Sequence, residues 1–308
     1  METKLEPNNK IEGKVSKEEI LTPGQMAWKN FRHNKIAMSG LIIFLFIVLV
    51  SIFGPIISPY KMDDIDLENT SSPPTITHLL GTDENGRDEL VRVMYAGRIS
   101  LSVGVMSVVI EVIIGGALGV ASGYYGGIVD SIIMRLVDIF SCLPTLPILM
   151  MIGAIMLDLK INPANKMYIL MLIIGILSWP GLCRMVRGEV LALREKEYMQ
   201  AAEALGLRDR RKMFKHLLPN TMATIIVTAA LGVGGAILTE SGLSFLGLGV
   251  TVPTPSWGSL IQSVSDIQSL QTYPWLWVPA GVAILLTVVS VNLIGDGLRD
   301  ALDPKHNN

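Results

Sequence analysis

The sequence predicts an all-α, polytopic membrane protein with six transmembrane helices. Half of its residues are hydrophobic and only 17% are charged, whereas charged residues make up about a quarter of soluble domains. The mean hydropathy is +0.48. The apolar residues gather in runs that are long enough to cross a hydrocarbon core of about 30 Å. The predicted spans are residues 36–57, 99–122, 131–157, 167–186, 221–249 and 277–298.

The first 35 residues form a polar segment, which we expect to be a cytoplasmic tail. It holds seven Lys/Arg and five acidic residues, and the run that follows, Ile36 to Tyr60, has no charge. A signal peptide would have a shorter apolar region and a cleavage site of small residues, and Phe53-Gly54-Pro55 is not such a site. We therefore expect an uncleaved first helix with the amino terminus inside the cell.

Lys61 to Gly97 is an acidic segment, expected outside the membrane, with eight Asp/Glu. Within it GTDENGRDEL (Gly81 to Leu90) resembles the start of a calcium loop. That loop needs a Glu eleven residues after Asp83, where this chain has Met94. The better interpretation makes Asp83 the N-cap of a helix that runs from Glu84 onward.

Glycine and proline give the second, third and fourth spans their character. Gly115, Gly116, Gly119 and Gly123 have the small-residue spacing that lets helices approach closely. A tight turn is expected over residues 123–130. The third span contains Pro144 and Pro147, which predict a kink, and the fourth is expected to be interrupted at Trp179-Pro180-Gly181.

The fifth and sixth spans flank an outer segment rich in Pro, Ser and Gly. This segment, Val250 to Pro274, has Asp266 as its sole charge. Its prolines and Trp257 predict a packed, partly re-entrant loop. Both chain termini are then expected in the cytoplasm. The longest polar stretches are too short for an independent soluble core.

A strongly charged loop, residues 187–220, separates the fourth and fifth spans. Arg187 to Lys215 contains eight Lys/Arg and five acidic residues, which places it on the cytoplasmic side. Alanine and leucine favour a helix before Gly206, and a second helix follows until Pro219. A helix, a glycine and a second helix make a compact protrusion that can fill a cleft on a partner. The bland alternative is a basic cluster that contacts lipid headgroups or nothing at all. Arg208 lies next to the glycine turn, where a protrusion would contact its partner, and the basic residues after it are expected to be solvated.

Motifs for catalysis are missing from the sequence. The phosphate-binding pattern G-x-x-x-x-G-K-[ST] does not occur, and neither does H-E-x-x-H or G-x-S-x-G. Cys142 and Cys183 lie in apolar runs, so neither a disulfide nor a metal site is expected. The chain is not predicted to hydrolyse ATP itself, and it is not predicted to bind a cofactor.

Three acidic residues fall at membrane depth, where a charge costs roughly 2.5–3.5 kcal/mol or more at a helix centre. They are Glu111, Asp138 and Glu240. Each either lines a translocation path or bonds to neighbouring helices. For Asp138 the structural role is favoured, for Glu111 the two roles are balanced, and Glu240 with Ser241 is favoured as path lining because glycines and serines surround it.

Several motifs together resemble one known family. Ala201-Ala202, Gly206 and His216-Leu217-Leu218-Pro219 are similar to the EAA loop of bacterial ABC-importer permeases, with Gln200 where the family usually has Glu. Further blocks resemble the C-type permease of dipeptide, oligopeptide and nickel importers. They are GTDENGRDELVRVMYAGRISL, GYYGGIVDSIIMRLVDIFSCLP, ESGLSFLGLGVTVPTPSWG and GDGLRDALDP.

The resemblance covers the chain from about Asn30 to Pro304 and implies the permease fold of type I ABC importers over residues 36–304, with a short tail at 305–308. It also implies a multi-pass protein of the bacterial inner membrane. The implied partners are a B-type permease, two ATPase subunits that bind ATP and Mg²⁺, an extracytoplasmic peptide-binding protein, the peptide and the lipid bilayer. No nucleic-acid partner is expected. The residues implied in ATPase docking are Ala201, Ala202, Gly206, Leu207 and Arg208.

Two other functions remain as alternatives. A nickel or metallophore importer of the same subfamily differs mainly in its binding protein, and the absence of a His/Cys/Met cluster along the spans slightly favours peptides. A secondary transporter would need its own coupling-ion site, and the sequence shows no inverted repeat.

Overall fold

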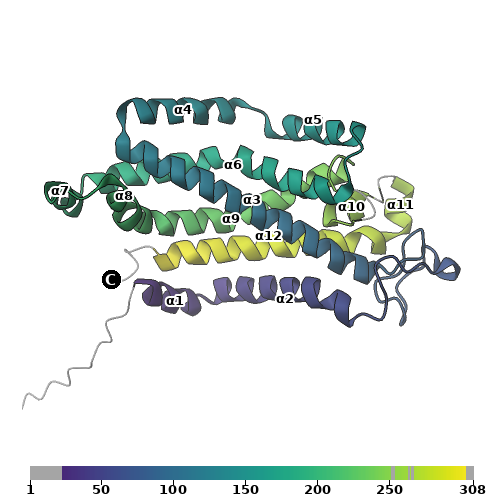
Figure 1. Cartoon of the computed structure of the whole chain (residues 1–308). Coiled ribbons are helices and arrows are strands. Elements are labelled where there is room, and N and C mark those ends of the chain that lie inside the picture. The colour runs from purple at the N-terminus through teal and green to yellow at the C-terminus, as the bar shows by residue number, and fades with distance from the viewer. Residues whose placement is uncertain (1–22, 251–253, 263, 265–266, 303–308) are drawn as a thin grey trace, which may run out of the picture.

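The computed structural model is an elongated bundle of helices (Figure 1). The structure describes residues 23–250, 254–262, 264 and 267–302. Five of its helices are long and apolar enough to cross a membrane, and a pair bent by 74° adds a sixth crossing if it forms one broken span. The five are α2 (Lys35–Ile57), α3 (Glu89–Tyr125), α6 (Pro163–Arg194), α9 (Leu218–Phe245) and α12 (Pro274–Leu302), and the bent pair is α4 (Gly127–Cys142) with α5 (Thr145–Asp158).

Helix α3 lies at the centre and packs against both α6 and α9, while α12 packs against α2 and α9. The glycine series of α3 explains its closest contact. A Cβ atom at Gly115, Gly119 or Gly123 would lie only 2.9, 2.8 or 2.9 Å from a carbonyl oxygen of α6. The small-residue spacing therefore does what it predicts, because one helical turn after another of α3 lies against the α6 backbone.

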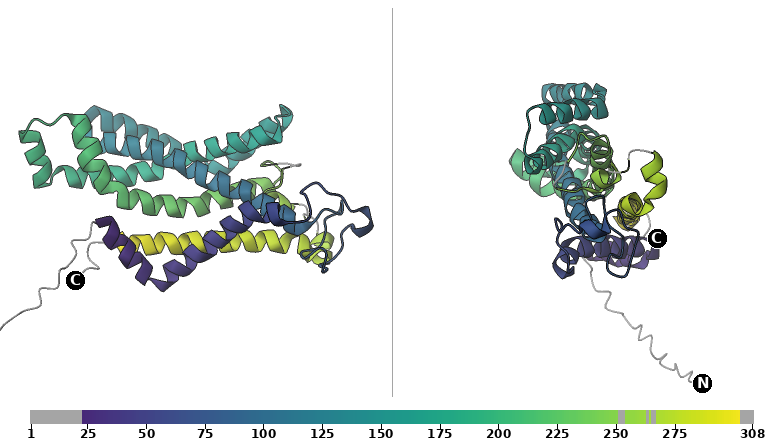
Figure 2. Two further views of the ribbon diagram at one scale, coloured as in Figure 1. Left: turned by 60° about the horizontal axis from the view of Figure 1, so that its bottom comes forward. Right: turned by 90° about the vertical axis from the view of Figure 1, so that its right-hand side faces the viewer.

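Shorter elements gather at the two ends of the bundle. One end, here named the α7 end, carries α1 (Pro23–His33), α7 (Glu197–Ala204), α8 (Asp209–Lys212) and the π-helical turn η2 (Met213–Leu217). The opposite end, named the α10 end, carries η1 (Leu67–Asn69), α10 (Trp257–Gln262) and α11 (Ile267–Thr272). Seen along the bundle, α4 and α5 lie on one side and α1 and α2 on the other (Figure 2).

Several expected boundaries need correction. Helix α3 begins at Glu89, and Asp88 rather than Asp83 is its N-cap, since Asp88 accepts a hydrogen bond from the Val91 amide. Helix α6 continues through Pro180 without interruption, because the other helices of a membrane bundle compensate for the lost hydrogen bond. Helix α3 also extends to Tyr125, so the turn before α4 is centred on Gly126 alone.

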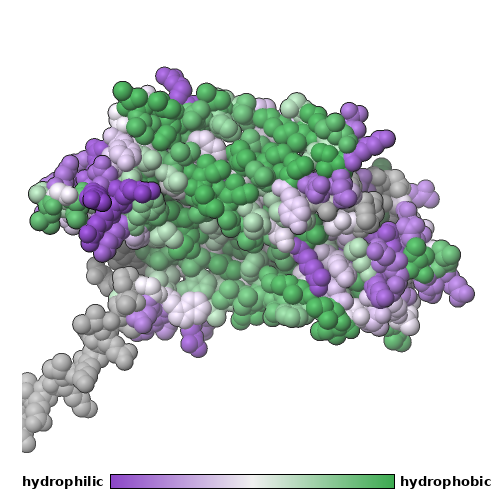
Figure 3. Space-filling view, viewed as in Figure 1, coloured by the Kyte–Doolittle hydropathy of each residue, from purple (hydrophilic) through white to green (hydrophobic). Residues whose placement is uncertain are grey.

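The outer segment around Trp257 is packed, as predicted. The Trp257 side chain is 1% exposed, and its indole nitrogen donates to the Val93 carbonyl oxygen at 3.1 Å. Asp266 falls outside the described residues. On the face seen in Figure 3, hydrophobic residues cover the middle of the bundle and hydrophilic residues gather toward both ends. This distribution fits a bundle that crosses a bilayer along its length.

Candidate functional site

The protrusion at the α7 end has the predicted architecture of helix, glycine and helix. Helix α7 ends at Ala204, and Gly206 then adopts φ of +66°, a conformation that favours glycine. The amide of Leu207 donates back to the Ala202 carbonyl oxygen at 3.1 Å. Helix α8 starts after Arg208, whose carbonyl oxygen accepts from the Arg211 amide.

The predicted docking residues divide between an inner and an outer face of the protrusion. Ala202 is 5% exposed and Leu207 is half-buried, so these two seat the protrusion on the bundle. Ala201, Gly206 and Arg208 are exposed. No atom of the residues that the structure describes lies within 4 Å of a Cβ at Gly206. The outer set is therefore free to meet a partner.

Leu205 completes this outer face and was not among the predicted residues. Its side chain is 79% exposed, although it is a large aliphatic group at the end of the bundle rather than in the apolar band. Its position directly before Gly206, which breaks the helix, could have predicted this exposure, because the last side chain of a protruding helix points outward.

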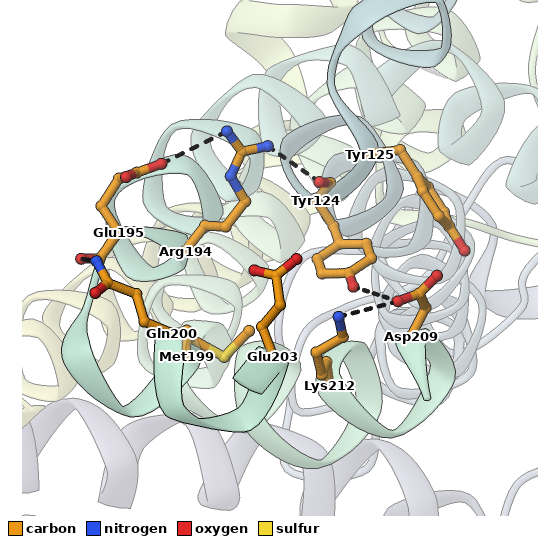
Figure 4. A pocket seen from close by; sticks show the side chains of 9 residues that line it. All are labelled: Tyr124, Tyr125, Arg194, Glu195, Met199, Gln200, Glu203, Asp209 and Lys212. Atoms are coloured by element: carbon orange, nitrogen blue, oxygen red, sulfur yellow. Dashed lines mark hydrogen bonds and ion pairs between the residues drawn. The ribbon is translucent and has the colours of Figure 1, made fainter. Parts of the chain in front are cut away.

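A cavity of about 530 Å³ lies behind the protrusion (Figure 4). Across it, the Tyr124 hydroxyl donates to Asp209 Oδ1 at 2.6 Å, and Lys212 Nζ lies 3.1 Å from the same oxygen. Arg194 donates to the Tyr124 carbonyl oxygen at 3.2 Å. These bonds join α8 and the end of α6 to the end of α3. The cavity is lined by Tyr124, Tyr125, Arg194, Glu195, Met199, Gln200, Glu203, Asp209 and Lys212.

Lys212 corrects the expectation that the basic residues after Arg208 are all solvated. Its side chain is 9% exposed, and its ammonium nitrogen lies 5.3 Å from the centre of the Tyr124 ring. The aliphatic part of a lysine can be buried while its charge meets a carboxylate and an aromatic face. Lys212 thus anchors the protrusion instead of extending from it.

The acidic residues expected on a path lie between helices. Glu240 is fully buried and accepts hydrogen bonds from Ser100 at 3.0 Å and Ser244 at 2.6 Å. Ser241 is 7% exposed, with its hydroxyl 3.5 Å from the same carboxylate. Glu111, 8% exposed, faces α9, where a Cβ at Gly232 would lie 3.3 Å from its Oε2.

The serines around Glu240 have second partners that extend the cluster to the α10 end. Ser100 accepts from the amide of Trp257 at 3.2 Å, and Ser244 accepts from the amide of Val250 at 3.1 Å. In this arrangement the Glu240 carboxyl group links α3, α9 and the start of α10. The hydroxyl donors supply the hydrogen bonds that a buried carboxyl group needs.

Another face of α9 carries a stripe of small and polar residues, which we name the α9 stripe. Its members recur every three or four residues, with Leu231 in the one gap of seven between Thr228 and Gly235, and so share one face of the helix. Among the described residues, no atom would lie within 4 Å of a Cβ at Gly235 or Gly242. The stripe consists of Asn220, Thr224, Thr228, Gly235, Thr239 and Gly242.

At the α7 end the α9 stripe forms the floor of a groove of about 580 Å³, with α6 and α12 as its walls. Sequence reasoning singled out acidic residues and missed this groove. The available signal was the helical spacing of threonine and glycine within an otherwise apolar span.

The acidic loop before α3 is held by its own charges. The Asp83 carboxylate accepts hydrogen bonds from the guanidinium groups of Arg87, at 2.8 Å, and Arg92. Two backbone amides, of Asn85 and Arg87, also donate to it. Its oxygens are therefore occupied by arginine and backbone donors, which is a different use from calcium ligation.

The chain matches two protein families along its length. Residues 115–308 match the family described as "Binding-protein-dependent transport system inner membrane component". Residues 22–74 match the "N-terminal TM domain of oligopeptide transport permease C".

Individual relatives agree with these matches. The oligopeptide transport system permease protein OppC of Bacillus subtilis (strain 168) is 41% identical over 293 residues, covering 94% of this chain and 93% of the relative. The dipeptide transport system permease protein DppC of Alkalihalophilus pseudofirmus is 39% identical, covering 92% and 91%. OppC of Haemophilus influenzae is 38% identical, covering 94% and 92%.

Proposed function

This chain belongs to the family of inner membrane components of binding-protein-dependent transport systems, and from that premise we propose that it is the C-type permease subunit of an ATP-driven importer of di- and oligopeptides. The names of its relatives, which are oligopeptide and dipeptide transport permeases, support the substrate class. The bacterial inner membrane is its location, and we place both termini and the α7 end in the cytoplasm.

The protrusion at the α7 end is the observation that carries this proposal. Leu205, Gly206 and Arg208 form an exposed knob, and the Tyr124–Asp209 hydrogen bond of 2.6 Å ties that knob to α3. A partner that moves the knob would therefore also move the central helix of the bundle. We assign the knob, with Ala201 beside it and Ala202 and Leu207 beneath it, to docking on an ATPase subunit.

The ATPase subunits would supply the energy for transport. This chain is a membrane permease and lacks a phosphate-binding loop, so we assign ATP and Mg²⁺ to two partner ATPases. A B-type permease would pair with this chain, and an extracytoplasmic binding protein would deliver peptide at the α10 end.

The α9 stripe is the proposed wall of the translocation path. Its threonines and glycines offer small, hydrogen-bonding surface where a lipid-facing helix would present large apolar side chains. The B-type permease would provide the opposite wall. Glu111, Glu240 and Ser241 lie between α3 and α9, so they would reach the path where these helices part during the transport cycle.

Uptake in a strain that lacks the gene tests the substrate class. Labelled dipeptide, a longer peptide and nickel are offered in parallel, with and without the gene restored. Loss and rescue of peptide uptake alone are expected. Loss and rescue of nickel uptake alone would overturn the peptide assignment while leaving the assembly with ATPases unaffected.

A further inference from the structure

We propose that Glu189 and Arg299 bind the charged termini of a peptide in the groove at the α7 end of the bundle. Glu189 would hold the ammonium group of the peptide, and Arg299 would hold its carboxylate. This inference rests on the proposed function, since it assumes that peptide passes along the α9 stripe. It adds a substrate-binding site to the α9 stripe, which is otherwise proposed only as a wall of the translocation path.

The groove has the size and the lining that such a ligand needs. Its volume of about 580 Å³ falls within the range of about 300–1,000 Å³ found for small-molecule sites. Glu189 stands on the α6 wall and Arg299 on the α12 wall, with the α9 floor between them. The remaining lining residues are Met185, Asn220, Ala223, Thr224, Val227, Thr228, Leu231 and Leu302.

The charge on the α6 wall has no partner within the described part of the chain. Oxygen Oε2 of Glu189 is buried and accepts no hydrogen bond. Buried carboxylate oxygens in native proteins are nearly always satisfied. Because Glu189 also lines the groove, a donor or a cation in the groove would meet this carboxylate once the side chain turns toward it.

The arginines of α6 do not pair with Glu189. All three face another carboxylate: Arg184 with Asp138 at 2.9 Å, Arg187 with Asp130 at 2.5 Å, and Arg194 with Glu195 at 3.5 Å. Glu189 is left out of these pairs.

On the opposite wall, Arg299 is exposed and forms no ion pair with any residue that the structure describes. A guanidinium group is well suited to a bidentate contact with a carboxylate.

One negative and one positive charge on facing walls match a zwitterion. Every unmodified peptide carries an ammonium group and a carboxylate, whatever its side chains are. On the floor, Thr224 offers a hydroxyl group to a peptide backbone, and Thr228, whose hydroxyl donates to Met185 Sδ at 3.7 Å, offers an acceptor oxygen. Recognition of termini and backbone alone would tolerate many peptide sequences, as a general peptide importer requires.

Protection of a cysteine in the groove tests the site directly. The complete transporter is purified in detergent without its binding protein, with Thr224→Cys in a background of Cys142→Ser and Cys183→Ala. Labelling by a maleimide is measured with a free dipeptide at increasing concentration, and with the same dipeptide acetylated and amidated at its termini. Ile226→Cys, on another face of α9 and 41% exposed, is the matched control.

Free dipeptide is expected to slow labelling at Thr224→Cys and to leave Ile226→Cys unchanged, while the blocked dipeptide protects neither. Adding Glu189→Gln or Arg299→Gln should raise the concentration for half-maximal protection about tenfold or more, as expected when one hydrogen bond to a charged group is lost. Arg299→Lys, which keeps the charge, should have a smaller effect.

Equal protection by the free and the blocked dipeptide, or no protection at all, would overturn the site. The comparison of these two peptides needs only the Thr224→Cys transporter, so it decides the question even if a charge variant fails to assemble. Uptake by cells with the unaltered gene separates the two proposals: uptake without protection refutes this site, whereas absence of peptide uptake refutes the proposed function.

Discussion

Gly206 shows how one backbone angle can determine a docking surface. Its φ is +66°, and an L side chain in that region costs roughly 1–2 kcal/mol. We expect Gly206→Trp to insert in the membrane at normal levels and to reduce peptide uptake at least about tenfold, which corresponds to about 1.4 kcal/mol of lost coupling. Uptake and membrane abundance are measured together.

Gly127 provides the matched control for Gly206. It also has a positive φ, +51°, and no atom of the described residues lies within 4 Å of a Cβ at this position, but it is the first residue of α4, outside the protrusion. Gly127→Trp should leave uptake closer to normal than Gly206→Trp does. Equal losses in the two variants would attribute the effect to backbone strain and count against docking at Gly206.

Glu240 allows hydrogen bonding to be separated from charge. We expect Glu240→Gln to retain acceptance from Ser100 or Ser244 and to lose little stability. Glu240→Ala leaves buried serine hydroxyls without that acceptor, which costs about 1–3 kcal/mol. Thermal unfolding in detergent checks this. A Glu240→Ala protein as stable as Glu240→Gln would show that the serine cluster does not hold the α10 segment.

The surroundings of Glu240 could not be predicted from the sequence. An acidic residue at membrane depth must face protein or water, and the sequence does not distinguish the two. Glu240 faces serines from two helices, one of them 140 positions away in the chain. Only the folded structure brings Ser100 to Glu240, so its full burial could not be predicted.

Two ion pairs join the same two helices, α4 and α6, so their contributions to stability can be compared directly. Asp130 and Arg187 form two hydrogen bonds of 2.5 and 2.6 Å with side chains 19% and 31% exposed. Asp138 and Arg184 form one of 2.9 Å with side chains 63% and 48% exposed. The first pair should therefore contribute more to stability.

We expect Asp130→Asn to lower the free energy of unfolding by about 2 kcal/mol, the range for hydrogen bonds to charged groups. Asp138→Asn should lower it by less, because this pair forms one hydrogen bond instead of two. Denaturation in mild detergent measures both values. Similar losses of stability in the two variants would mean that the surroundings of the two pairs in the membrane, rather than the number of hydrogen bonds, set their strength.

The sequence predicted a feature correctly where that feature depends on the backbone or the small size of the residue itself. Gly206 ended α7, and the α3 glycines marked the contact with α6. Boundaries failed where distant contacts decide. Asp83 looked like an N-cap, but it binds Arg92 and leaves Asp88 to cap α3. The α9 stripe was missed because a single sequence does not show which helix face meets lipid and which meets a groove.

The helix bundle leaves a large apolar surface that its own helices do not cover. On α2, Ile42, Phe46 and Leu49 are 62%, 64% and 52% exposed, and their spacing places them on one helix face. Such a face is stable against lipid or another apolar helix, as is the hydrophobic band that Figure 3 shows across the bundle. The band positions the α7 end and the α10 end on opposite sides of a membrane.

The orientation of the bundle across that membrane leads to a prediction that labelling can test. The α7 end carries the strongly charged segment, so we propose by the positive-inside rule that this end faces the cytoplasm. Ile76, in the acidic loop at the α10 end, is 97% exposed, and His33 at the end of α1 is exposed too. With Cys142 and Cys183 replaced, Ile76→Cys should react with a membrane-impermeant maleimide in cells whose inner membrane is intact. His33→Cys should react only after that membrane is permeabilised, and the reverse pattern would place the knob outside the cell, where no ATPase could dock on it.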